Sequence, residues 1–179
     1  MSDSSADKKE PWINQMALTT VIFAVCATLS TFKGGAYSTT SVINQAQASD
    51  QWSFYQAKSM KQHLFEIQVD QMKLQEMALD PRNPARQAFE DKIKQDQEQI
   101  SRYAKEKKDI EAKARELESQ RDEAKRHNRP FGLAVMLLQV TILLSSIAGL
   151  LKSKKIWWTA LPIGLVGIFY FLDGFFVFL

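Results

Sequence analysis

The stretch "LDPRNPAR", residues 79–86, divides a long polar region into two halves. Pro81 and Pro84 cannot continue a helix, because proline lacks the backbone N–H and its ring clashes with the preceding turn. Asn83 suits either a turn or the N-cap of a following helix. The sequence therefore predicts that one helix ends here and that another begins.

After this turn, apolar and charged positions recur in alternating steps of four and three residues. The pattern lasts for about five heptads, which is typical of a coiled coil. Three of its positions are charged, so it does not predict a tight zipper. Its members are Phe89, Ile93, Asp96, Ile100, Tyr103, Lys107, Ile110, Ala114, Leu117, Arg121 and Ala124.

A second stripe with the same alternation precedes the turn. Its members are Ala57, Met60, Leu64, Ile67, Gln71, Leu74 and Ala78. Folding the chain at residues 81–84 sets the two stripes face to face, with Leu74 opposite Ile93 and Gln71 opposite Asp96. Residues 34–129 are thus predicted to form a long, coiled-coil-like antiparallel helical hairpin.

The same register extends towards the ends of the predicted hairpin. It places Ile43 opposite Ala124, and it brings Asp50 within one helical turn of Arg121. Opposite charges at that separation can form an ion pair, so Asp50 and Arg121 are a candidate intrachain pair.

Three apolar runs flank the polar region, at residues 13–32, 131–151 and 156–179. Each has roughly the 20 residues that a helix needs to cross the hydrocarbon core of a bilayer. The second and third are joined only by "KSKK", residues 152–155, which predicts a transmembrane hairpin. A signal peptide is the alternative for the first run, but no small-residue cleavage site ends it before Lys33.

The predicted class is therefore an all-α integral membrane protein. A polar tail at 1–12 precedes three transmembrane helices, and the helical hairpin lies between the first and the second. Gly34 and Gly35 are expected to form a flexible joint where the chain leaves the membrane. Pro130, which follows Arg129, marks the expected point of re-entry.

Trp52 and Tyr55 require a separate explanation, because they fall off the stripe that begins at Ala57. Trp52 also lies about 28 Å along the helix from Lys33, too far for an aromatic belt at the membrane surface. We expect both rings to be contacts between copies of the chain, with a ligand platform as the alternative.

Two polar residues occur inside the predicted spans, Gln139 and Asp173. An intramembrane carboxylate is by default a functional hypothesis, so ion or proton handling stands beside a structural or interfacial role. Small residues at helical spacing, including Gly164, Gly167 and Gly174, predict close helix packing. That packing fits contacts within one copy as well as contacts between copies.

Little in the sequence suggests chemistry. The net charge is only +3. Nucleic-acid-binding proteins usually carry a concentrated basic face, so no nucleic acid partner is expected. Cys26 is the only cysteine, which excludes an intrachain disulfide. His63 and Glu66 could touch one metal ion, but His127 is too distant to join them and a site needs three or four ligands. No metal, cofactor or catalytic activity is expected.

One pattern is specific to a family. Ala48-Ser49-Asp50-x-Trp52-x-x-Tyr55-Gln56-Ala57-Lys58, together with the later "KSKKIWW", resembles the bacterial membrane-protein family called domain of unknown function 4337. The resemblance implies a small inner-membrane protein. It carries no activity and no functional residue to this chain.

The favoured function is a homo-oligomeric membrane scaffold with a bundled helical stalk. Two alternatives are a channel or transport accessory, with a pore lined by Thr20, Gln139, Ser146 or Asp173, and a sensor arm for another envelope protein. Short loops follow the positive-inside rule best. The N-terminus and the 152–155 loop are therefore expected in the cytoplasm, with the long hairpin outside.

Overall fold

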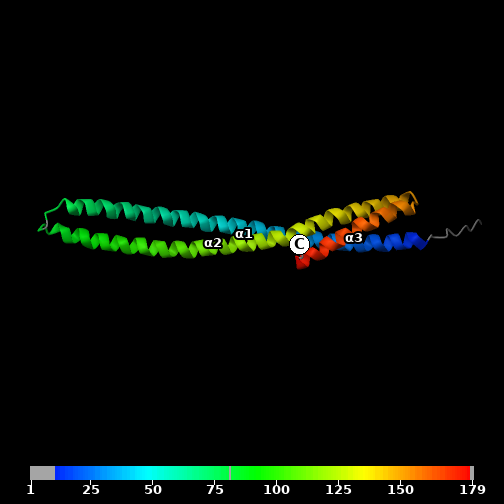
Figure 1. Ribbon diagram of the computed structural model, residues 1–179, viewed down its shortest axis with the longest axis horizontal. Coiled ribbons are helices and arrows are strands. Elements are labelled where there is room, and N and C mark those ends of the chain that lie inside the picture. Colours follow the sequence, from blue (N-terminus) through cyan, green and yellow to red (C-terminus); the bar gives the residue numbers. More distant parts are fainter. Residues whose placement is uncertain (1–10, 81, 178–179) are drawn as a thin grey trace, which may run out of the picture. The chain divides into compact units, whose positions relative to one another are not determined.

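The computed structural model describes residues 11–80 and 82–177 (Figure 1). Three helices account for nearly all of them: α1 at Pro11–Met77, α2 at Ala85–Leu150 and α3 at Lys154–Phe176. These residues include no strand, so the predicted all-α class is confirmed. The polar tail up to residue 10, Pro81 and the last two residues of the third predicted span lie outside this description.

The first two helices run without a break through the predicted flexible joint and through the predicted point of re-entry. α1 continues through Gly34 and Gly35, and α2 contains Pro130. The flexible-joint prediction is wrong because Gly34 serves close packing instead. A Cβ atom there would lie 3.1 Å from the Cβ of Phe131 and 3.3 Å from Oδ1 of Asn128.

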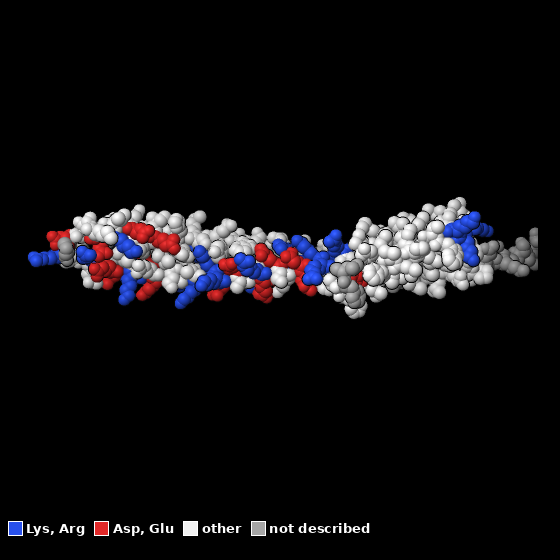
Figure 2. Space-filling view, viewed as in Figure 1, with Lys and Arg blue, Asp and Glu red and all other residues white. Residues whose placement is uncertain are grey.

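The chain divides into two compact units, each built from parts of α1 and α2. Val42–Arg121 forms one, here named the charged unit. The other, named the apolar unit, combines the segments up to Ser41 and from Asp122 onwards, including α3. Charged side chains of both signs cover the first, whereas the visible face of the second is mostly uncharged with basic residues at either end (Figure 2).

Within the charged unit, α1 and α2 contact each other through pairs that run in opposite order along the chain. Gln45 bonds Arg121, Lys58 pairs with Glu106, and Glu76 pairs with Arg86. A buried cluster of Val69, Met72 and Ile93 forms the apolar centre, with Phe89 and Ile100 packed against it.

The predicted stripe of α2 is confirmed. Each member, from Phe89 to Arg121 in the charged unit and Ala124 in the apolar unit, is buried or half-buried. The stripe includes Asp96, which is fully buried and accepts a 2.8 Å hydrogen bond from Nζ of Lys92.

The predicted stripe of α1 is wrong. All of its members are exposed, among them Met60 at 69%, Leu64 at 60% and Leu74 at 68% of their surface. The residues facing α2 lie on another side of the helix: Ala48, Trp52, Tyr55, Lys58, Gln62, Phe65, Val69 and Met72. The proposed pairings of Leu74 with Ile93 and Gln71 with Asp96 therefore do not occur, and Ile43 is exposed as well.

The turn is held by local side chains, as the sequence indicated. Oδ1 of Asp80 accepts from the backbone N–H of Arg82, and Oδ1 of Asn83 accepts from that of Ala85, both at 2.9 Å. Asn83 thus satisfies an N–H that the first turn of α2 would leave without a partner. The guanidinium of Arg86 lies 3.0 Å from Glu76 and ties the two helix ends together.

The apolar unit packs three helical segments around small residues. Phe23 and Ala27 of α1 form a buried cluster with Ala134 and Leu138 of α2. The glycines of α3 admit these neighbours closely: a Cβ at Gly164 would lie 2.5 Å from the ring of Phe23, and one at Gly167 would lie 2.9 Å from Leu138. The small residues of α3 therefore pack within one copy of the chain.

Changing Val69 to Asp should destabilise the charged unit by about 2–4 kcal/mol, because it buries a charge without a partner. Ile67→Asp, two residues away on the exposed side of α1, should leave the unit intact. Hydrogen exchange of the amides around Ile93 and Tyr103 in the full-length protein measures the difference. The register predicted from the sequence demands the opposite ranking of the two variants.

Candidate functional site

The aromatic pair of α1 lies in its contact with α2. Nε1 of Trp52 donates a 2.9 Å hydrogen bond to Oε1 of Glu118. The Trp52 and Tyr55 rings meet edge to face at 5.5 Å, and Nζ of Lys107 lies 5.1 Å from the centre of the Tyr55 ring. The premise that these two rings miss the intrachain contact is therefore wrong, whereas their contact between copies stays a prediction.

A charged cluster continues this contact one turn further along. Glu106 lies 2.5 Å from Nζ of Lys58 and 3.5 Å from Nε of Arg102. Both cations also sit about 5 Å from the ring of Tyr103, in cation–π geometry. The hydrogen bond from Lys58 lowers the pKa of Glu106, with help from the charges of Lys58 and Arg102.

The predicted partner of Arg121 is not the residue it bonds on α1. Its Nη1 donates to Oε1 of Gln45 at 2.6 Å. Asp50, one turn further along α1, has an exposed side chain. Arg121 does join the two helices, through the side-chain amide of Gln45.

The stripe that the sequence assigned to the intrachain contact is an apolar surface instead. We name it the outer stripe: Ala57, Met60, Leu64, Ile67, Gln71, Leu74 and Ala78. Beside it lies an open pocket of about 380 Å³ lined by Lys61, Leu64, Phe65, Gln68 and Tyr103. Contiguous exposed apolar surface with heptad spacing is characteristic of a protein interaction site.

In the apolar unit, the two predicted polar residues have opposite environments. Gln139 is exposed, and Gly132 and Ser146, at heptad spacing from it, are exposed too. Asp173 is buried, with 3% of its surface exposed. Thr20 is half-buried and donates its hydroxyl to the carbonyl of Met16 at 2.8 Å.

Asp173 belongs to a junction between α1, α2 and α3. Its neighbour Gly174 accepts a 2.9 Å hydrogen bond from Nδ1 of His127, and the His127 ring stacks on Tyr37 at 4.8 Å. A Cβ at Gly174 would lie 2.8 Å from the ring of Phe131. Because a carbonyl can only accept, His127 carries its proton on Nδ1 here.

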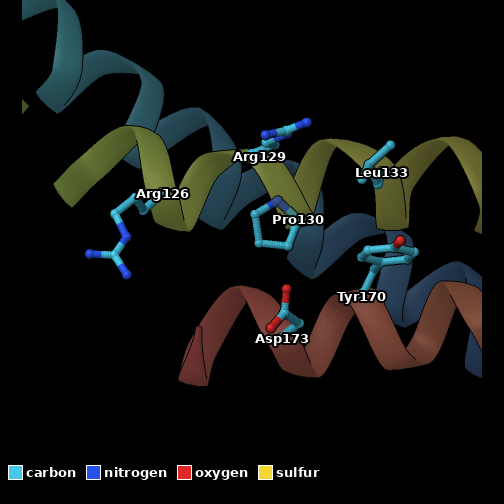
Figure 3. A pocket seen from close by; sticks show the side chains of 6 residues that line it. All are labelled: Arg126, Arg129, Pro130, Leu133, Tyr170 and Asp173. Atoms are coloured by element: carbon cyan, nitrogen blue, oxygen red, sulfur yellow. The ribbon is translucent and has the colours of Figure 1, made fainter. Parts of the chain in front are cut away.

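An open pocket of about 320 Å³ adjoins this junction (Figure 3). It is lined by Arg126, Arg129, Pro130, Leu133, Tyr170 and Asp173. The sequence pattern predicted Asp173 as a candidate site residue, but it did not predict Arg126 or Arg129. The available signal was their position immediately before a proline and a long apolar run.

Of the three residues considered for a metal site, His63 and Glu66 lie together. His63 lies 3.4 Å from Glu66, which also accepts a 2.7 Å bond from Gln62. His127 lies in the other unit. Over residues 11–80 and 82–177, the structure contains no group of three histidine, cysteine or acidic side chains arranged for a metal ion.

These features define an all-α protein whose three helices each contain a stretch long and apolar enough to cross a membrane. Residues 12–177 match the family described as Domain of unknown function (DUF4337), and the chain belongs to this family. No curated protein and no solved structure matches the sequence.

The lowered pKa of Glu106 predicts a specific acid sensitivity. A carboxylate whose pKa is lower in the folded state stabilises folding fully above its unfolded-state pKa. That stabilisation is lost as the pH falls from the usual glutamate range through the lowered value. Glu106→Gln should remove this part of the acid transition, measured by circular dichroism, whereas Glu98→Gln at an exposed position should retain it.

Proposed function

We propose that the chain is a homo-oligomeric membrane scaffold without catalytic activity. In this proposal the apolar unit spans a bacterial inner membrane. The charged unit stands outside the bilayer as an antiparallel helical hairpin, and the outer stripe joins the hairpins of different copies into a stalk.

The packing of the apolar unit supports membrane insertion. Trp12, Ala148 and Trp157 cluster at one end of the three helical segments, and Gly34, Phe131 and Gly174 meet at the other. Between these two levels the helices rise by about 26–33 Å, close to the hydrocarbon thickness of a bilayer. Large apolar side chains point outward over this distance, including Leu18, Val25, Leu143 and Leu165.

Assembly through the charged unit rests on one observation, the exposure of the outer stripe. Two helices can each bury only one face against the other, and here α1 presents Trp52, Tyr55 and Val69 to α2. Its second heptad face is left uncovered within the described chain. Another copy carries the same face, and homo-oligomers are the commonest assemblies of soluble proteins.

A channel or transport accessory is the second candidate, and the exposure of Gln139 favours it. An amide inside an apolar span is costly to face with lipid, so it favours a partner helix or water. Clustering of the spans below the stalk would supply either one. Purified protein in liposomes separates the two functions, because only a pore would pass ions or small solutes.

The sensor-arm alternative uses the same surface for a different partner. An envelope protein could cover the outer stripe in place of a second copy. Mass measurement of the pure protein in mild detergent distinguishes them, since a sensor arm would remain monomeric.

Met60→Gln, Leu64→Gln and Ile67→Gln, made together, should weaken association by at least about 2 kcal/mol, because they remove large apolar contacts from the interface. Particle mass in detergent at falling protein concentration measures the effect. Helicity should persist, because none of these three residues lies in the contact between α1 and α2. Lys73→Gln, at an exposed position off the stripe, is the control.

Trp52→Ala with Tyr55→Ala provides the contrasting variant. Because both rings pack between α1 and α2, their removal should lower the melting temperature of the charged unit. A normal melting temperature combined with loss of assembly would return these rings to the interface between copies and would contradict the role of the outer stripe.

Orientation follows from the short basic loop. Lys152, Lys154 and Lys155 favour a cytoplasmic position, whereas long loops translocate largely regardless of charge. A cysteine at position 105 of a Lys105→Cys variant should react with a membrane-impermeant maleimide in spheroplasts. A Lys154→Cys variant should react only after the membrane is opened, and the reverse pattern would invert the topology.

A further inference from the structure

We infer that Gln139 of α2 pairs with Gln139 of a second copy of the chain at mid-depth in the membrane. The inference rests on the proposed function, because it requires the apolar unit to be inserted in a bilayer. It adds a contact between copies that is separate from the outer stripe, since Gln139 belongs to the apolar unit and the outer stripe to the charged unit.

Gln139 lies close to the middle of the proposed span. It is eight residues from Phe131, at one end of the apolar unit, and nine from Ala148, at the other. At about 1.5 Å per residue, these separations are roughly 12–14 Å along the helix. A glutamine side chain is much shorter than that, so its amide cannot reach the aqueous surface on either side.

The amide of Gln139 has no partner within the described part of the chain. The side chain is exposed and forms no hydrogen bond there. Exposed hydroxyls of the same unit behave differently: Ser146 donates to the carbonyl of Ile142 at 2.9 Å, and Thr28 bonds the carbonyl four residues before it. Because an amide left without hydrogen bonds in hydrocarbon is costly, insertion favours a polar partner for Gln139.

Gln139 belongs to an uncovered stripe of α2, here named the span stripe: Gly132, Met136, Gln139, Leu143, Ser146 and Leu150. Its members recur in alternating steps of four and three residues, and every one of them is exposed. Two helices that cross at about 20° keep such a stripe in continuous contact. A Cβ atom at Gly132 would meet nothing within 4 Å, so this end of the stripe is open. No member is charged, so identical stripes can approach without like-charge repulsion.

The apolar neighbours of Gln139 favour a helix over water as its partner. Met136 and Leu143, about one turn away on either side, are 58% and 64% exposed. A water-filled pore would wet both side chains, whereas a second helix buries them together with the amide. Only a protein surface both satisfies the amide and covers its neighbours.

A second copy supplies the complementary group at the required depth. Copies that insert with the same topology run parallel, and they place Gln139 at the same level of the bilayer. The side-chain amide has both donors and acceptors, so two amides related by a twofold axis can form reciprocal N–H···O bonds. A different membrane protein would need a polar group of its own at that depth.

Disulfide cross-linking tests the contact in membranes from cells that express the full-length protein. In a Cys26→Ala background, Leu143→Cys should give a covalent dimer, because equivalent residues of a symmetric helix contact come within disulfide range. Leu165→Cys is the control, since Leu165 is 63% exposed near the middle of α3 and lies off the span stripe. An assembled protein in which Leu143→Cys links no better than Leu165→Cys would overturn the proposal.

Gln139→Leu tests the amide itself. It should weaken association about tenfold, which is the size expected for hydrogen bonds between membrane helices. Gln139→Asn keeps an amide and should retain most of the affinity. Particle mass at falling ratios of protein to detergent measures association. Circular dichroism should show unchanged helicity in both variants, because position 139 is exposed.

Failure of this contact can be told from failure of the proposed function. A protein that assembles equally well before and after Gln139→Leu contradicts the pairing alone. If Gln139→Leu instead lowers solute flux through liposomes without changing particle mass, the amide faces a pore and the pairing is wrong. An unaltered protein that is monomeric at every ratio, and forms no cross-link through either cysteine, contradicts both the pairing and the scaffold.

Discussion

The charged unit depends on a geometric limit: two helices can bury only one face of each other. α2 has one heptad stripe and uses it. α1 has two faces that could fill the contact, one aliphatic and one carrying aromatic and long polar side chains. The second faces α2, so the aliphatic face becomes surface. The aliphatic face of α1 is therefore the surface that the proposed assembly uses.

Polar partners on α2 explain why the less apolar face of α1 packs against α2. Glu118 accepts a hydrogen bond from the Trp52 N–H, and the ammonium of Lys107 lies over the Tyr55 ring. Lys58 forms an ion pair with Glu106. Each contact pairs a ring or a cation of α1 with a charged group of α2. Aromatic residues bring a large apolar area as well as these directional contacts. Leu64 or Ile67 could supply only area, and would leave the charged groups of α2 without these partners.

The sequence predicted the elements better than it predicted their contacts. Helix class, the turn around Asn83 and the stripe of α2 could be read from it, because proline chemistry and a single heptad pattern allow few alternatives. The facing side of α1 could not, since hydrophobicity alone ranked the outer stripe first. Gly34 illustrates the same limit: a glycine suits a hinge and a close contact equally, and only the position of Phe131 decides between them. The pocket at Asp173 required residues of α2 and α3 that only the tertiary structure brings together.

Several ion pairs on the surface of α2 join residues of that same helix. Arg115 pairs with Glu111, Lys113 with Glu116 and Arg102 with Glu106, each three or four residues apart. Opposite charges are thus matched along one helix before any second molecule approaches. In the proposed assembly, neighbouring charged units would meet surfaces of locally balanced charge, with little long-range repulsion between them. Their spacing would then depend on contact shape and on the apolar face, and it would respond only weakly to the ionic strength of the surrounding medium.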